Sequence, residues 1–196
     1  MKTVRHRVSR ENLGHIFLTG IPPNTAYNAN RREKNALEAP PVRMKIVDII
    51  SPDAFIAHLR SQTKEDVLRE LSERVERNMP SMGAGTLTSI LMERESLGST
   101  GIGDGIAIPH GKSLQLDRLV AAFGRSLPGV PFDSMDGKPT HLFFLLAGPT
   151  ESTGMQLKAL TRISRLLINE TFRQQLMAAG DANDLWRIFK KEDDRG

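Results

Sequence analysis

Residues 98–112 read GSTGIGDGIAIPHGK, and this stretch is more informative about fold and function than any other part of the chain. Glycine tolerates positive φ and lets backbone N–H groups approach a ligand closely, and glycine turns can form concave groups of N–H donors that favour anions. The apolar run 106–108 predicts a short strand, and Pro109 restricts its own φ and that of the residue before it. We therefore predict that His110 stands at a stiff strand end beside a loop suited to a phosphate.

Two common glycine-loop motifs fit this stretch poorly. A nucleotide-binding P-loop needs four residues between its glycines, whereas five residues, Pro109 among them, separate Gly105 from Gly111. A dinucleotide fingerprint needs G-x-G-x-x-G, whereas Gly101, Gly103 and Gly105 form G-x-G-x-G. The residues alone leave one further alternative, a glycine-rich hairpin turn with a surface histidine.

The longer segment 93–112, ERESLGSTGIGDGIAIPHGK, resembles the phosphorylation-site motif of the fructose/mannitol-type IIA proteins of the bacterial phosphoenolpyruvate-dependent phosphotransferase system. Its wording is most similar to that of the nitrogen-regulatory branch. The resemblance extends more loosely over residues 44–191 and does not cover 1–43. It implies an α/β fold with a mixed central sheet flanked by helices on both faces, and a IIA domain over residues 44–196.

The resemblance implies that His110 is a phosphoryl acceptor. This role is chemically reasonable because a neutral imidazole, with an ordinary pKa of about 6.5, is a competent nucleophile near neutral pH. Arg94 lies sixteen residues before His110, which is the family's spacing for its site arginine. A guanidinium fork suits a phosphoryl group. The alternative for Arg94 is an ion pair with Glu93 or Glu95 on a solvated helix face.

The resemblance also implies a second histidine about forty-six residues after the acceptor, but that position here is Gln156, and residues 142–196 contain no histidine. An amide can hydrogen-bond a phosphoryl oxygen or the His110 ring, but it carries no charge. Lys158 is a candidate substitute for the missing charge. The predicted phosphate-binding loop comprises Ser99, Thr100, Gly101, Gly103, Gly105 and Gly111. No cofactor and no metal site are predicted.

The partners follow from the same resemblance. The expected donor is a histidine-phosphorylated phosphocarrier protein, docked on an apolar rim of Ile102, Ile106 and Ile108. The leading prediction for the output is nitrogen-related regulation of protein targets. One alternative is a sugar-specific IIA component that passes the phosphoryl group to a IIB domain during fructose- or mannitol-type uptake. Another is a binding module that has lost phosphorylation, which only Gln156 favours.

Composition limits the class of protein. A chain of 196 residues has room for one domain with a sizeable core. It contains no cysteine, which excludes disulfides, thiol catalysis and cysteine metal sites. The longest apolar run, 142–147, is far shorter than the roughly twenty residues that span a bilayer, and the N-terminus lacks the apolar segment of a signal peptide. We therefore predict a soluble, cytoplasmic protein without membrane insertion.

Charge is distributed unevenly along the chain. Residues 1–43 contain eight Lys/Arg and three Asp/Glu, a net of +5, which leaves nineteen Lys/Arg and twenty Asp/Glu, a net of −1, for 44–196. The high pI therefore comes from the first segment, and the remainder gives no reason to expect nucleic-acid binding. Residues 1–43 are polar and rich in turn signals, which predicts a basic, disordered leader. Its alternatives are a basic tether for an acidic partner and a translation start placed too early.

Hydrophobic periodicity predicts strands alternating with helices, and hence an α/β fold. Strands are expected at 55–59, 119–126 and 141–147, and helices at 64–78, 84–95, 153–168, 170–179 and 181–191. Thr63 and Asp181 are the expected N-caps. Trp186 is interpreted as a packing anchor, and Asp104 as a turn residue beside the glycines. His58 and His141 are interpreted as structural histidines.

Overall fold

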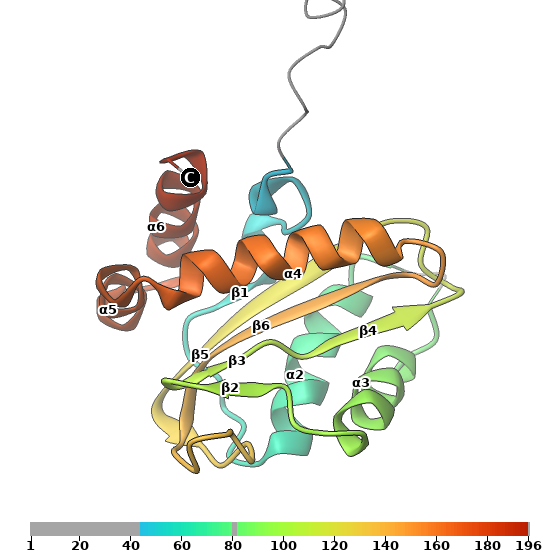
Figure 1. Cartoon of the computed structure of the whole chain (residues 1–196), viewed down its shortest axis with the longest axis horizontal. Helices are drawn as coiled ribbons and strands as arrows, with labels where there is room; N and C mark the ends of the chain where they lie inside the picture. The colour runs from blue at the N-terminus through green and yellow to red at the C-terminus, as the bar shows by residue number, and fades with distance from the viewer. Residues whose placement is uncertain (1–43, 80–81, 196) are drawn as a thin grey trace, which may run out of the picture. The chain divides into compact units, whose positions relative to one another are not determined.

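The computed structural model describes residues 44–79 and 82–195, so the predicted leader lies outside the described residues. Within the described part, a mixed sheet runs in the order β1-β5-β6-β3-β2, and β4 also pairs with β6 (Figure 1). The strands are β1 (Phe55–Ile56), β2 (Gly101–Gly103), β3 (Ile106–Ala107), β4 (His110–Ser113), β5 (Val120–Val130) and β6 (Thr140–Pro149). The central pair β5–β6 is antiparallel, whereas β1, β3 and β4 join it in parallel.

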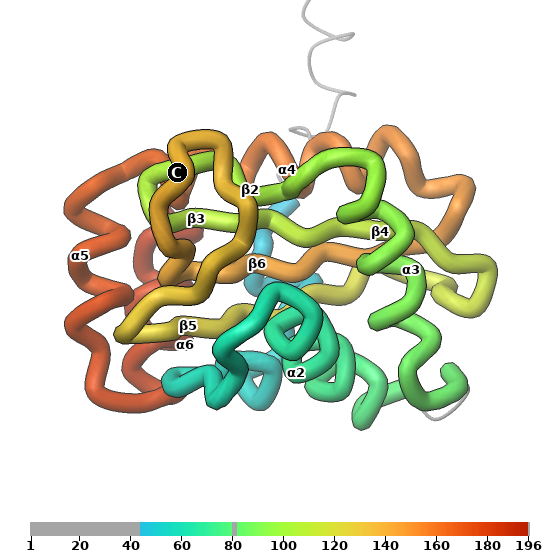
Figure 2. Tube along the Cα trace, turned by 90° about the horizontal axis from the view of Figure 1, so that it is seen from below, coloured from blue at the N-terminus to red at the C-terminus, as the bar shows by residue number. Residues whose placement is uncertain are grey.

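Helices cover both faces of this sheet, as predicted. They are α2 (Lys64–Glu76), α3 (Thr86–Ser96), α4 (Thr153–Ile168), α5 (Glu170–Ala178) and α6 (Ala182–Arg195), with short 3-10 turns η1 (Ile46–Asp48) and η2 (Pro52–Ala54) before β1. Figures 1 and 2 show α2 and α3 on one face, α4 and α6 on the other, and α5 beyond one end of the strands. None of the helices in residues 44–79 and 82–195 has the length and apolar character needed to cross a membrane.

The central strand β6 is buried on both faces. Every residue of the run 142–147 is at most 2% exposed, which explains why this strand reads as a continuous apolar segment instead of an alternating one. On the face covered by α6, the ring of Phe189 lies 5.5–6.2 Å from those of Phe123, Phe144 and Phe172. Trp186 packs edge-on against Phe55 at 5.6 Å, as its predicted role of packing anchor requires.

Local sequence rules set the helix starts correctly. The Thr63 hydroxyl accepts a hydrogen bond from the Asp66 backbone N–H at 3.2 Å, and Asp181 accepts one from the Asp184 N–H at 2.8 Å. Each bond satisfies an N–H that has no partner within its helix. Both predicted caps are therefore confirmed, and the helix ends differ from the predicted ones by at most four residues.

The short strands were predicted less well. Strand β1 covers only two of the five residues expected at 55–59, although the Leu59 N–H still donates to the Arg125 carbonyl oxygen of β5 at 2.9 Å. Strands β2 and β4 were missed, because GIG and HGKS contain too few apolar residues to show a strand pattern. His110 therefore begins strand β4 instead of ending the strand before it.

Candidate functional site

His110 is held by both ring nitrogens. Its Nδ1 lies 2.8 Å from the Ile108 carbonyl oxygen, and its Nε2 lies 3.3 Å from Arg94 Nε. A carbonyl oxygen only accepts hydrogen bonds, so Nδ1 must carry the ring proton. The neutral ring therefore has its lone pair at Nε2, where it accepts a hydrogen bond from Arg94 Nε.

Arg94 reaches His110 because α3 packs tightly on β4. A Cβ added at Gly111 would lie 2.7 Å from the Ile90 side chain, so only glycine allows this approach. Arg94 stands in the last turn of α3 and also donates to the Gly98 carbonyl oxygen at 3.0 Å. No ion pair joins it to Glu93 or Glu95 among the described residues. The structure thus brings Arg94 and His110 together.

The surroundings favour the neutral form of His110. Burial lowers the pKa of His110 below its usual value, the Ile108 carbonyl opposes this, and the Arg94 charge lowers it further. Because a neutral imidazole is the nucleophilic form, the ring is ready to attack an electrophile at neutral pH.

Gln156 comes from α4, which covers the opposite face of the sheet from α3 (Figure 1). Its side chain lines the same pocket as Arg94 and His110. Its side-chain amide donates to the Gly111 carbonyl oxygen at 2.9 Å, and the residue is 4% exposed. Lys112 is the nearby cation: it lines the same pocket, and its Nζ bonds the Thr153 hydroxyl at 2.6 Å. Lys158 is exposed and sits about 200° around the helix from Gln156. The structure therefore points to Lys112, which sequence reasoning left unassigned, in place of Lys158.

The glycine loop is divided between two places. Ile106 pairs with Leu142 of β6, whereas His110 pairs with Leu146, and four residues along a strand correspond to about 13 Å. Gly103 and Gly105 lie at the far end, where both have positive φ and turn the chain between β2 and β3. The structure does not bring these two glycines to His110.

Asp104 lies between these two glycines, at a φ of 53°. Its backbone N–H donates to the Asp136 carboxylate at 3.1 Å. The structure therefore agrees with the turn-forming role assigned to Asp104.

The Ser99 and Thr100 hydroxyls already have partners. Ser99 donates to the Phe132 carbonyl oxygen at 2.8 Å, and it accepts from the Gly101 N–H at 3.1 Å. Thr100 donates to Glu95 at 2.6 Å and is buried. These residues shape the segment that approaches Ile108, and their hydroxyl protons do not face an incoming group.

Of the three members of the predicted apolar rim, Ile102 is 42% exposed, whereas the other two are buried. Ile106 and Ile108 are 2% and 5% exposed because both point into the core. The exposed apolar side chain that lines the His110 pocket is Leu97, after α3, at 82%.

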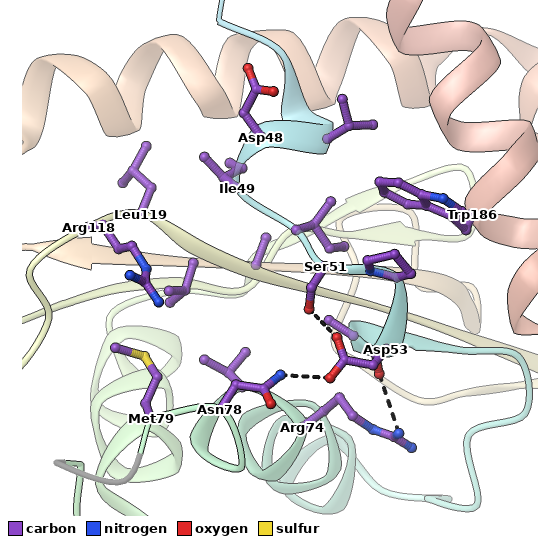
Figure 3. Close-up of a pocket in the computed structure, with 17 residues that line it drawn as sticks. Asp48, Ile49, Ser51, Asp53, Arg74, Asn78, Met79, Arg118, Leu119 and Trp186 are labelled. Carbon is purple, nitrogen blue, oxygen red and sulfur yellow. Dashed lines mark hydrogen bonds between the residues drawn. The ribbon is translucent and has the colours of Figure 1, made fainter.

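Two cavities differ in what they offer chemically. The His110 pocket has a volume of about 380 Å³ and is lined by Arg94, Lys112 and Gln156 among others. A larger cavity of about 780 Å³ lies beside η1, η2 and the end of α2 (Figure 3). There the Asp53 carboxylate accepts hydrogen bonds from Ser51 and Asn78, and no histidine lines the cavity. The His110 imidazole lines the smaller pocket, which we take as the candidate site.

His141, in β6, shows no comparable arrangement among the described residues. His141 is partly buried, and its Nδ1 lies 3.1 Å from the Ser126 carbonyl oxygen. It lies beside the Gly105 turn, with no arginine bonded to its ring among the described residues. This placement is consistent with a structural role for His141.

The described residues form an α/β protein in which helices cover both faces of a mixed sheet. A histidine–arginine pair lies at the start of one of its short parallel strands. The family model described as "Phosphoenolpyruvate-dependent sugar phosphotransferase system, EIIA 2" matches residues 48–192. The chain therefore belongs to this family and is a IIA-type protein of the phosphotransferase system.

Its relatives include both nitrogen-regulatory and sugar-specific proteins. The chain is 35% identical to a nitrogen regulatory protein of Bradyrhizobium diazoefficiens over 146 residues, which cover 74% of this chain and 95% of that protein. It is also 35% identical to the fructose-specific EIIABC component of Bacillus subtilis, over 76% of this chain and 24% of that protein.

Solved structures agree with the fold. IIA-Ntr of Neisseria meningitidis superposes with a TM-score of 0.69 at 31% identity, over 74% of this chain and 98% of that one. IIA mannitol of Escherichia coli superposes with a TM-score of 0.60 at 19% identity, over 71% and 97%. The predicted α/β class and the resemblance to IIA proteins are both confirmed.

Proposed function

We propose that His110 accepts a phosphoryl group on Nε2. The observation that carries this proposal is the pair of contacts to the ring: Ile108 holds the proton on Nδ1, and Arg94 lies against Nε2. One nitrogen is thereby made the nucleophile, and the nearest charge is one that binds phosphoryl oxygens. Membership of a phosphotransferase family supports the same reaction.

The transfer balances without a cofactor. The Nε2 lone pair forms a new N–P bond as the P–N bond of the donor phosphohistidine breaks, and that electron pair returns to the donor nitrogen. The Nδ1 proton stays in its bond to Ile108. Arg94 then exchanges the Nε2 lone pair for phosphoryl oxygens, and Lys112 adds a second positive charge nearby. Phosphoryl transfer needs mainly this kind of positioning and charge stabilisation.

The proposed donor is a histidine-phosphorylated phosphocarrier protein. Leu97, which is 82% exposed, and the partly buried Ile90 line a pocket that also contains Arg94 and Lys112. A carrier with an apolar patch beside its phosphohistidine would fit such a surface, since apolar residues with a central charge suit a transient interface.

We further propose that the output is regulatory. Several nitrogen regulatory proteins are 30–35% identical to this chain over 74% of its length. A phosphoryl group adds roughly two negative charges at an exposed pocket, which can switch a protein interface by electrostatics alone. Transfer to a IIB domain is the second candidate, because the fructose-specific relative matches at equal identity.

The test is phosphoryl incorporation from labelled phosphoenolpyruvate through purified enzyme I and phosphocarrier protein. We expect acid-labile, base-stable label on the wild type and none on His110→Ala. Unlabelled wild type, with the donors shown to be active on another IIA protein, would overturn the proposal and favour a binding module. Adding a fructose- or mannitol-type IIB domain then separates the two outputs, since rapid loss of label to IIB supports uptake and retention supports regulation.

A further inference from the structure

Glu95 is a buried carboxylate directly behind the candidate site. It lies in the last turn of α3, and its side chain is 4% exposed. It accepts the Thr100 N–H at 3.0 and 3.1 Å, the Thr100 hydroxyl at 2.6 Å and Lys64 Nζ at 3.0 Å. Burial alone would raise the pKa of Glu95, but the bonds from Thr100 and Lys64 outweigh it and lower the pKa below its usual value.

One line of contacts runs from Glu95 to Nδ1 of His110. Glu95 holds Thr100 through both its N–H and its hydroxyl. The Thr100 carbonyl oxygen accepts the Ile108 N–H at 3.0 Å, and the Ile108 carbonyl oxygen meets Nδ1 at 2.8 Å. Thr100 and Ile108 are both at most 5% exposed, so this line lies in the protein interior.

A second line of contacts runs from Glu95 to Nε2. By binding Thr100, the carboxylate closes the loop formed by residues 96–99. The Gly98 N–H donates to the Glu95 carbonyl oxygen at 3.1 Å, and the Gly98 carbonyl oxygen accepts Arg94 Nη1 at 3.0 Å. The same loop therefore orients the guanidinium that contacts Nε2. Glu95 lies at the common origin of both contacts to the His110 ring.

Lys64 forms an ion pair with the buried Glu95 carboxylate, which offsets part of the cost of burying its charge. It is the first residue of α2, and its Nζ also bonds Asp133 at 2.8 Å and lies 5.0 Å from the Phe132 ring centre. Burial lowers the pKa of Lys64, but the Asp133 and Glu95 carboxylates outweigh it and raise the pKa. A glutamine at position 95 would lose the ion pair with Lys64. Its amide nitrogen would also place a donor where one carboxylate oxygen now accepts from Thr100.

We propose that Glu95 is a positioning residue for phosphoryl acceptance: by closing the loop to Thr100, it holds the Ile108 carbonyl at Nδ1 and Arg94 at Nε2 of His110. This inference rests on the proposed function of His110. It assigns to Glu95 no contact with the phosphoryl group. Its effect is to select one ring tautomer and one guanidinium position before the donor arrives.

The test compares the full-length wild type with Glu95→Gln, Thr100→Val and Thr100→Ser, and with Glu73→Gln as a matched control at an exposed site of α2. Ring ¹⁵N chemical shifts of His110 report which nitrogen carries the proton, and a merely structural role would leave them unchanged in a folded variant. The second readout is the initial rate of phosphoryl acceptance from the phosphocarrier.

We expect the Nδ1–H tautomer and full rate in the wild type, Thr100→Ser and Glu73→Gln. Glu95→Gln should give mixed tautomers and slow acceptance by about tenfold or more, because small misplacements of reacting groups are costly. Thr100→Val should move both readouts in the same direction by less. A folded Glu95→Gln that matches Glu73→Gln in both would overturn the proposal.

Two further outcomes are also decisive. If Glu95→Gln does not fold, Thr100→Val decides, and wild-type tautomer and rate in that variant would overturn the proposal. If the wild type accepts no phosphoryl group, the proposed function fails, and the tautomer comparison still determines whether Glu95 sets the state of the His110 ring.

Discussion

Arg94 and Arg125 both donate to backbone carbonyls, yet they stand in opposite situations. Arg125, in β5, is 1% exposed, and its Nε donates to the Ala57 carbonyl oxygen at 2.9 Å. Its Nη1 donates to three carbonyl oxygens at the end of α5, those of Leu176, Met177 and Ala179. Arg94 is half-buried, bonds one carbonyl and one imidazole nitrogen, and has no further hydrogen-bond partner among the described residues.

The difference separates a structural cation from a functional one. Arg125 ties the C-terminal end of α5, where helix carbonyls lack partners and cations are favoured, to the edge of the sheet. Its donors face fixed acceptors, so it has nothing to offer a ligand. Arg94 keeps donors free on the side of an open pocket, so it can change partners when a phosphoryl group arrives. Residue type and burial alone would have favoured Arg125 over Arg94 as the functional arginine.

The largest expected effect on stability comes from Arg125→Met, which keeps an unbranched apolar stem and removes the guanidinium donors. We expect the free energy of unfolding to fall by about 3 kcal/mol or more, since several buried carbonyls lose their partner, and Tm to fall by roughly 6–12 °C. Chemical and thermal denaturation measure both. Arg118→Met, at an exposed arginine, is the matched control. A loss below about 1 kcal/mol would show that the α5 carbonyls find water instead.

The converse substitution, Arg94→Met, should leave stability within about 1 kcal/mol of the wild type. The rate of phosphoryl acceptance should fall about a hundredfold, because a charged donor at a phosphoryl group acts mainly in the transition state. Rapid-quench transfer from the phosphocarrier measures this rate, and Arg94→Lys should retain part of it. Equal rates in Arg94→Met and Arg118→Met would remove Arg94 from the proposed site.

The smallest expected effect is on pH dependence. The folded pKa of His110 lies below the unfolded value of about 6.5, first through burial. As pH falls, the unfolded chain therefore binds a proton at this histidine first. The free energy of unfolding decreases from about pH 6.5 downward and levels off once the folded ring is also protonated. The rate of phosphoryl acceptance should stay level as pH drops through 6.5 and should decline only at the lower folded pKa of His110, where the ring becomes protonated.

NMR titration of the His110 ring checks this expectation directly. Arg94→Met should move the midpoint upward, because the Arg94 charge lowers the pKa of His110. A wild-type midpoint at or above 6.5 would show that hydrogen bonding outweighs burial at this ring.

Much of the fold could be predicted from the chain, because its long elements carry strong local patterns. The run 142–147 indicated a buried central strand, and helices 64–78 and 153–168 showed an apolar stripe at helical spacing. Short strands such as β2 and β4 could not be predicted in this way, since three or four mostly polar residues become a strand only through their partners in the sheet.

The candidate site was predicted in part. Its two central residues, Arg94 and His110, were identified by motif and spacing, and the structure places their side chains in contact. The glycines were interpreted as one phosphate loop because they are adjacent in sequence. The structure uses Gly111 for helix packing and Gly103 and Gly105 for a turn.

By itself, the sequence determined the α/β class, the order of the main elements, the family resemblance and the identity of the proposed acceptor, because these depend on local periodicity and on a contiguous motif. Only the tertiary structure decided which nitrogen of His110 has the lone pair, that Lys112 and not Lys158 faces the pocket, and that Glu95 lies behind both ring contacts. The reason is physical: a tautomer, a pocket lining and a buried ion pair are set by groups that approach in space from α2, α3, β4 and α4.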